Sequence, residues 1–207
     1  MNCGAMSNRV DLPEKKYDGY IFDLDGTLVD SMPLHFKAWR KALLEAGAPE
    51  SVFQADEFYS CGGKSATDVV KFLNERYGLI MDAEATAANK RAIYLELLQT
   101  EGMQPIKEVM DFVYSLGDAP KAIATGSALP GACSTLKSAG LEGVFELILT
   151  PDDVKHGKPA PDMFLLAAEK LGVDPTKCVV FEDALPGMTA AAAAGMDCVV
   201  VKRPELS

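Results

Sequence analysis

Short apolar runs recur along the chain and predict the strands of a buried sheet. Each run is bounded by turn-forming or charged residues and lacks polar alternation, which is typical of parallel strands covered on both faces. We predict strands at Gly19–Phe22, Ala122–Ala124, Phe145–Leu149, Cys178–Phe181 and Cys198–Val201. Helical segments alternate with these strands at Ile106–Leu116, Pro130–Ala139, Asp162–Leu171 and Pro186–Ala194. This alternation predicts an α/β core with a doubly wound, Rossmann-like parallel sheet.

Between the first and second predicted strands, the pattern changes to helices alone. Helical spacing is clear in Leu34–Ala46. A second helix begins at Ser65 with a capping-box type start, and Ala83–Gln99 is predicted to be a third, longer helix. About seventy residues of helix are too many for a crossover connection. We therefore expect an inserted all-helical cap domain at 32–101 and a core domain made of 17–31 and 102–207. Residues 1–16 are expected to form a polar, disordered leader.

The charge and the cysteines narrow the classes of partner. A formal net charge of −10 argues against nucleic acid, because the field repels phosphate backbones. The same field means that any phosphate site needs local positive charge or a metal. Five scattered cysteines without C-x-x-C spacing fit reduced thiols in a cytoplasmic protein. No apolar run suits a signal peptide or a membrane span, so no membrane partner is expected. A monomer is the default expectation.

Two carboxylates follow the first predicted strand. Asp23 and Asp25 stand at positions i and i+2, which share one face of a strand, and Gly26 allows a sharp turn. Ligands of open α/β sheets bind at this edge. A solvated Asp-Gly turn is the simpler alternative, but it does not explain an acid directly after the apolar Phe22. A calcium loop fails, because its glycine belongs at the sixth position and Gly26 occupies the fourth.

The run FDLDGTLVD resembles the first motif of the haloacid dehalogenase superfamily. The other motifs of that family follow in order, each near the end of a predicted strand: Thr125-Gly126-Ser127, then Lys158 ahead of a helix, then Glu182-Asp183. Taken singly, these are a turn, a solvated lysine and an acidic helix start. Four motifs in register, covering nearly all of the chain after residue 18, make a chance match improbable.

The resemblance implies Mg²⁺-dependent phosphoryl transfer. Asp23 would attack phosphorus and form an aspartyl-phosphate, and Asp25 would protonate the leaving oxygen and later activate water. Thr125 and Lys158 complete the expected catalytic set, Lys158 supplying fixed positive charge. The expected metal ligands are Asp23, Asp25 through its backbone carbonyl, Glu182 and Asp183. The expected substrate-binding residues are Gly126, Ser127, His35, Gly62 and Lys64.

The insert resembles the β-phosphoglucomutase-like branch of the family, through Asp30-Ser31, His35 and Trp39. Mutases of that branch hold a second phosphate with a Lys and an Arg in the cap loop, and Cys61 and Ser65 occupy those positions here. The loop is thus short of cations for a bisphosphate intermediate. The segments that contain Lys158 and Glu182-Asp183 resemble small phosphatases acting on fructose-1-phosphate and related sugars. We therefore expect hydrolysis of a small phosphorylated metabolite, with a phosphohexomutase as the alternative.

Four other interpretations of these residues are possible. His35 could equally be a packed structural residue. Gly63-Lys64-Ser65 resembles the end of a P-loop, but Phe58 stands where its first glycine is required. Cys61 lacks the arginine of a cysteine phosphatase, because Thr67 stands in its place. A non-catalytic binding protein on the same fold predicts the loss of a motif residue, and none is missing.

Overall fold

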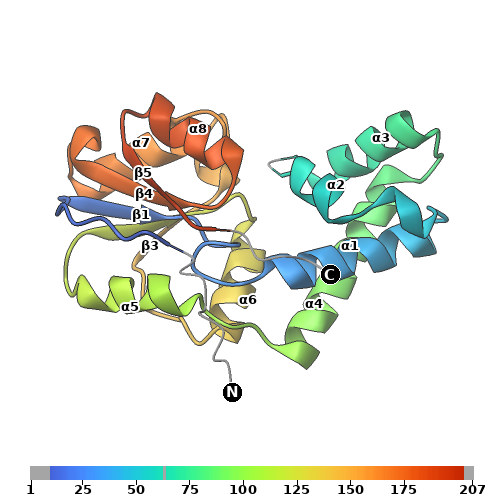
Figure 1. Cartoon of the computed structure of the whole chain (residues 1–207), viewed down its shortest axis with the longest axis horizontal. Coiled ribbons are helices and arrows are strands. Elements are labelled where there is room, and N and C mark those ends of the chain that lie inside the picture. Colours follow the sequence, from blue (N-terminus) through green and yellow to red (C-terminus); the bar gives the residue numbers. More distant parts are fainter. Residues whose placement is uncertain (1–9, 63, 203–207) are drawn as a thin grey trace, which may run out of the picture.

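A computed structural model describes residues 10–62 and 64–202 of the chain. Its strands form one five-stranded parallel sheet in the order β3-β2-β1-β4-β5. The strands are β1 (Gly19–Phe22), β2 (Lys121–Ala124), β3 (Leu147–Leu149), β4 (Cys178–Glu182) and β5 (Asp197–Val200). The first strand of the chain is therefore the central strand of the sheet, and the chain winds outward from it in both directions (Figure 1).

Helices cover both faces of this sheet, as the apolar runs predict. On one face lie α5 (Lys107–Ser115) and α6 (Leu129–Ser138), and on the other lie α7 (Asp162–Leu171) and α8 (Leu185–Ala193) (Figure 1). Successive strand side chains alternate between the two layers. Phe22 packs into the cluster with α5 and α6, while Ile21 packs into the cluster with α7 and α8. The predicted doubly wound α/β fold is confirmed.

Three details differ from the sequence expectations. The third strand begins at Leu147, and Phe145 is buried in the core outside the strand. The last strand is not covered on both faces: Val200 is 48% exposed, because β5 is the edge of the sheet. Val10 belongs to the core rather than to a polar leader, since it is buried and bridges Val201. Residues 1–9 of the expected leader lie outside the described residues.

The insert after β1 is helical: α1 (Met32–Glu45), α2 (Ala55–Ser60), α3 (Ala66–Tyr77) and α4 (Ala83–Glu101). Ser65 caps α3 as predicted, its hydroxyl accepting a hydrogen bond from the backbone N–H of Asp68 at 3.1 Å. A short 3₁₀ turn at Glu50–Val52 and the six-residue α2 were not predicted. Both are too short to show a helical period.

The insert has its own hydrophobic cluster, but two of its helices also pack into the core. Phe36 and Trp39 of α1 lie in the insert cluster with Leu73 of α3. The other face of α1, and Tyr94 and Leu98 of α4, join the cluster of the core. In Figure 1, α1 and α4 extend from the core toward α2 and α3. The expected boundaries at 31/32 and 101/102 fall where α1 begins and where α4 ends. The two linkers that join these helices to the core run side by side.

Those linkers are held together by backbone contacts. Val29 bridges Pro105 in an antiparallel sense, and the N–H of Asp30 donates to the carbonyl of Gln104 at 3.0 Å. The chain thus leaves and re-enters the core at one place. Within the described part of the chain, none of the helices combines the length and the apolar character needed to cross a membrane.

The central packing of the sheet predicts a measurable stability difference. The ring of Phe181 on β4 is fully buried and stacks on Phe22, with 4.7 Å between ring centroids. We expect Phe181→Ala to lower the free energy of unfolding by about 3–5 kcal/mol, because it leaves a cavity. Tyr114→Ala, on the exposed side of α5, should change it by at most about 0.5 kcal/mol. Urea denaturation of both variants tests this, and equal losses would contradict the assigned core.

Candidate active site

Three acidic side chains meet at the carboxyl end of the sheet. Asp23 follows β1 directly, Glu182 is the last residue of β4, and Asp183 comes next. Because β1 and β4 are parallel neighbours with Phe22 opposite Phe181, their ends deliver these residues to one place. All three are buried, and each offers one carboxylate oxygen within 4.8 Å of the others. This acidic trio (Asp23, Glu182 and Asp183) is the centre of the candidate site.

Lys158 joins the trio from the loop between β3 and α7. Its Nζ lies 2.6 Å from Asp23 Oδ1 and 2.7 Å from Glu182 Oε1, and its side chain is only 9% exposed. Burial disfavours a charged lysine, but the carboxylates of Asp23 and Glu182 outweigh it and raise the pKa of Lys158. Lys158 is therefore a fixed cation inside an acidic protein, which meets the need for local positive charge.

Lys158 does not fully compensate the negative charge of the three carboxylates. Burial raises the pKa of Asp23 well above its ordinary range; Lys158 opposes this shift, while Glu182 and Asp183 add to it. Buried carboxylate oxygens of this kind are the ligands that Mg²⁺ prefers, and a divalent ion would relieve the crowding. The residues present therefore fit a magnesium site.

The two oxygens of Glu182 already have partners. Oε1 accepts from Lys158, and Oε2 accepts from the backbone N–H of Ala184 at 2.8 Å. The carboxylate also lies against the first turn of α8, where a Cβ atom added to Gly187 would fall 1.8 Å from Oε1. A glycine is thus required at 187 for Glu182 to reach Lys158.

Asp25 occupies a different environment from Asp23. β1 ends at Phe22, and the chain bends at Leu24 between the two aspartates, so their carboxylates do not share a strand face as the sequence suggested. Asp25 Oδ2 accepts from Ser127 Oγ at 2.6 Å, and Oδ1 lies 3.6 Å from His35 Nε2. Burial alone would raise the pKa of Asp25, but His35, Ser127 and Ser31 lower it below the ordinary value.

His35 connects Asp25 to a lysine that sequence analysis missed. The Nδ1 atom of His35 lies 2.8 Å from Nζ of Lys90 on α4. Burial lowers the pKa of Lys90 to about 8, and its ammonium lies over the rings of Trp39 and Tyr94. A protonated Lys90 can only donate, so Nδ1 accepts and Nε2 carries the hydrogen that faces Asp25. Nothing in the sequence distinguishes Lys90 from other helical lysines.

The remaining predicted residues lie in two loops. Thr125 is buried after β2, and its Oγ1 accepts from the backbone N–H of Ser127 at 3.0 Å, while Gly126 between them is exposed. Gly62 and Lys64 are exposed in the loop between α2 and α3. The ammonium of Lys64 lies 5.4 Å from the ring centroid of Phe72 on α3. Gly63 between them lies outside the described residues.

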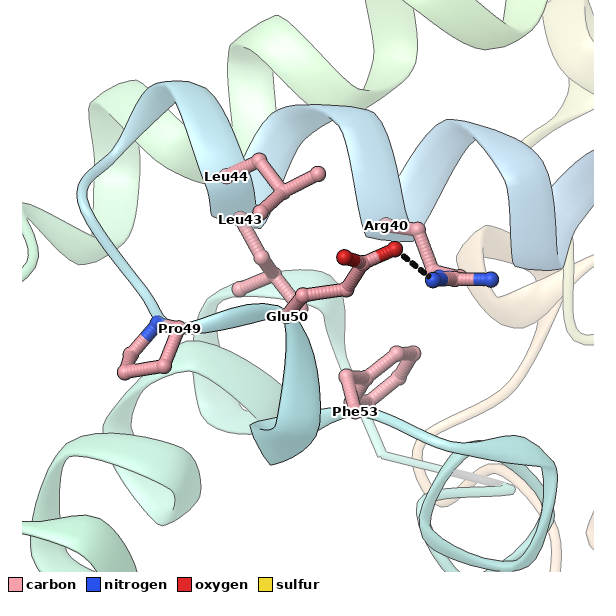
Figure 2. Close-up of a pocket in the computed structure, with 6 residues that line it drawn as sticks. All are labelled: Arg40, Leu43, Leu44, Pro49, Glu50 and Phe53. Atoms are coloured by element: carbon pink, nitrogen blue, oxygen red, sulfur yellow. Dashed lines mark hydrogen bonds and ion pairs between the residues drawn. The ribbon is translucent and has the colours of Figure 1, made fainter.

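A hollow on α1 is a separate feature. It lies between α1 and the segment from Pro49 to Phe53, with Arg40 hydrogen-bonded to Glu50 at its edge (Figure 2). None of the predicted site residues lines it. The carboxyl edge of the sheet therefore remains the candidate site.

Comparison with known proteins identifies the family. A model of haloacid dehalogenase-like hydrolases matches residues 17–195. The fructose-1-phosphate phosphatase YqaB of Escherichia coli (strain K12) is 39% identical over 91% of this chain and 98% of its own. Hexitol phosphatase A of the same organism is 36% identical over 90% and 83%. The crystal structure of a HAD hydrolase, family IA, variant 3, from Entamoeba histolytica HM-1:IMSS has a TM-score of 0.74 at 29% identity, covering 87% of this chain and 82% of that one.

The chain therefore belongs to the haloacid dehalogenase-like hydrolases. This bears out the resemblance that the four motifs indicate. The acidic trio and Lys158 belong to the first, third and fourth of those motifs.

The contact between Gly187 and Glu182 leads to a prediction with a matched control. Helices α6 and α8 both open with Leu-Pro-Gly, which places Gly131 and Gly187 at the same helical position. We expect Gly187→Ala to cost about 1–3 kcal/mol of unfolding free energy, because the new methyl group displaces Glu182. Gly131→Ala meets no atom within 4 Å and should stabilise by about 0.4–1 kcal/mol. Chemical denaturation measures both, and a Gly187→Ala protein as stable as Gly131→Ala would refute the contact.

Proposed function

We propose that this protein is a Mg²⁺-dependent phosphatase that hydrolyses a small sugar phosphate through an aspartyl-phosphate on Asp23. The observation that carries the proposal is the position of Asp23. It is buried at the end of the central strand, 2.6 Å from Lys158 and beside Glu182 and Asp183. A structural carboxylate gains nothing from such crowding, whereas a nucleophile that receives a phosphoryl group needs cations around it.

The chemistry is divided between two aspartates. Asp23 attacks phosphorus, and Lys158 holds it in place and neutralises charge on the phosphoryl oxygens. Thr125 and the exposed backbone at Gly126 lie after the neighbouring strand β2, where they can hold those oxygens. A bound magnesium ion would be held by Asp23, Asp183 and the Asp25 carbonyl, and would supply further charge neutralisation. Glu182 would act mainly through Lys158, because both its oxygens are engaged.

Asp25 serves as the proton shuttle. Its carboxylate is held charged in the free protein by Ser127 and His35. An arriving phosphate brings negative charge to the same edge and so favours the protonated form that can donate to the leaving oxygen. After the sugar leaves, the carboxylate accepts a proton from the attacking water. Both ring nitrogens of His35 face protein groups, which favours a role in orienting Asp25 over the expected substrate contact.

The relatives support the substrate class. The two E. coli proteins described above are named for fructose-1-phosphate and hexitol phosphates, and each aligns with about nine-tenths of this chain. The loop between α2 and α3 supports hydrolysis over mutase chemistry, because Lys64 packs against Phe72 and Cys61 is buried where mutases carry a lysine. A monomer and a cytoplasmic location stay predictions from the sequence.

The first test removes the nucleophile. We expect the purified protein to release phosphate from hexose phosphates with Mg²⁺, to stop when EDTA removes the metal, and to resume when Mg²⁺ is added back. Asp23→Asn should abolish release without unfolding the protein. Asp18→Asn makes the same chemical change at an exposed residue paired with Lys177, and should keep full activity. An active Asp23→Asn protein would refute the nucleophile assignment.

The second test separates hydrolysis from mutase chemistry. The protein is supplied with β-glucose-1-phosphate and a catalytic amount of hexose bisphosphate, and both glucose-6-phosphate and free phosphate are measured. We expect free phosphate to exceed the isomer, because the cap loop lacks the paired cations that hold a second phosphate. Efficient isomerisation with little free phosphate would favour the mutase.

A further inference from the structure

A closed ring of contacts surrounds Asp25 and returns to a single core helix. One oxygen of Asp25 accepts from Ser127, in the loop that leads into α6. The other faces His35, whose ring stacks on Tyr94 of α4. The hydroxyl of Tyr94 lies 3.1 Å from Oγ1 of Thr135, which is on α6 itself. Both sides of the Asp25 carboxylate are therefore tied to α6, one through the loop that leads into it and one through two rings.

The stack between His35 and Tyr94 has a specific geometry. The ring centroids are 4.1 Å apart and the planes are parallel to within 1°. A stacked neighbour contacts only the face of the imidazole, so both nitrogens stay available in the ring plane. Nδ1 meets Lys90 and Nε2 faces Asp25. Because Nε2 is 3.6 Å from Asp25 Oδ1, a small rotation of the ring decides whether a hydrogen bond forms.

Tyr94 is itself held firmly. It is 5% exposed, and Thr135 is 2% exposed, so their hydroxyl pair is shielded from water. A buried tyrosine hydroxyl requires a partner, and Thr135 provides it from the core. The hydroxyl end of Tyr94 is therefore anchored to α6, and the packing of its ring among core side chains holds the ring plane, although Tyr94 belongs to the helical insert.

We propose that Tyr94 is a positioning residue for proton transfer, which sets the plane of the His35 ring and thereby aims Nε2 at Asp25. The proposal rests on the proposed function of Asp25 as the proton shuttle. A residue with only a packing role would affect folding and all substrates alike. A residue that aims Asp25 affects only those reactions that need a proton at the leaving oxygen.

Two substrates separate these roles. The sugar of a hexose phosphate would leave as an unstable alkoxide, so its departure needs a proton. The 4-nitrophenolate of 4-nitrophenyl phosphate is a stable anion and leaves without one. The value of kcat/KM covers the steps up to release of the leaving group, so later hydrolysis of the aspartyl-phosphate does not enter it. The ratio of kcat/KM for hexose phosphate to kcat/KM for 4-nitrophenyl phosphate therefore reports on proton donation.

We expect Tyr94→Leu to lower this ratio about 10-fold, part of the 10²–10⁴-fold that a general acid contributes. Tyr94→Met, which also lacks a flat face, should behave alike and serves if the leucine variant folds poorly. Tyr94→Phe keeps the ring and should restore the ratio to within about 3-fold of the wild type, as should Thr135→Val. Leu98→Ala is the packing control, because Leu98 also lies on α4 and belongs to the same hydrophobic cluster as Tyr94. It should lower stability while leaving the ratio unchanged.

The outcomes are distinct. Equal losses on both substrates in Tyr94→Leu and Tyr94→Met, or no loss on either, would overturn the positioning role while leaving the phosphatase assignment intact. A wild-type protein that releases phosphate from neither substrate would overturn the proposed function, and the positioning role with it.

Discussion

The ammonium of Lys158, held between Asp23 and Glu182, is the interaction on which the site depends. Carboxylates at the ends of two neighbouring parallel strands would repel each other if no cation stood between them. The loop after β3 brings Lys158 there, and its side chain loses nearly all contact with water in doing so. A lysine buried this far is stable as a cation only beside such carboxylates. Lys158 and the two carboxylates thus stabilise each other's charged forms. The negative charge that Lys158 leaves uncompensated favours binding of a metal ion.

Small residues allow this crowding. A Cβ atom at Gly26 would lie 2.8 Å from the carboxylate of Asp183, and φ of 89° at Gly26 turns the chain away from β1. Gly187 in turn leaves room for Glu182. The bend at Leu24 separates Asp25 from Asp23. One carboxylate faces Lys158, and the other faces Ser127 and His35, so two aspartates two residues apart acquire different chemistry. Environment, rather than residue type, assigns their roles.

Much of the fold is predictable because its signals are local. Apolar runs locate all five strands to within two residues at either end, and the glycine after α7 takes the left-handed conformation expected of a helix end. The burial of β5 was mispredicted because position in the sheet is not a local property. The four motifs find Asp23, Lys158, Glu182 and Asp183, which the structure brings together. They do not find Lys90, Tyr94 or Thr135, because these helical residues belong to no motif. Their place near Asp25 depends on tertiary contacts that the sequence pattern does not show.

The helical insert contributes side chains to the candidate site. A cap expected to provide substrate contacts also supplies the surroundings of Asp25, through His35 on α1 and through Lys90 and Tyr94 on α4. The surroundings of Asp23, the proposed nucleophile, come wholly from the sheet and its loops, whereas those of Asp25, the proposed proton shuttle, come from the sheet and the insert together. Because α1 and α4 pack into the core cluster, the surroundings of Asp25 are held by the folded core. If Asp23 and Asp25 have the proposed roles, substrate specificity can vary in α2, α3 and their loop without changing the surroundings of either aspartate.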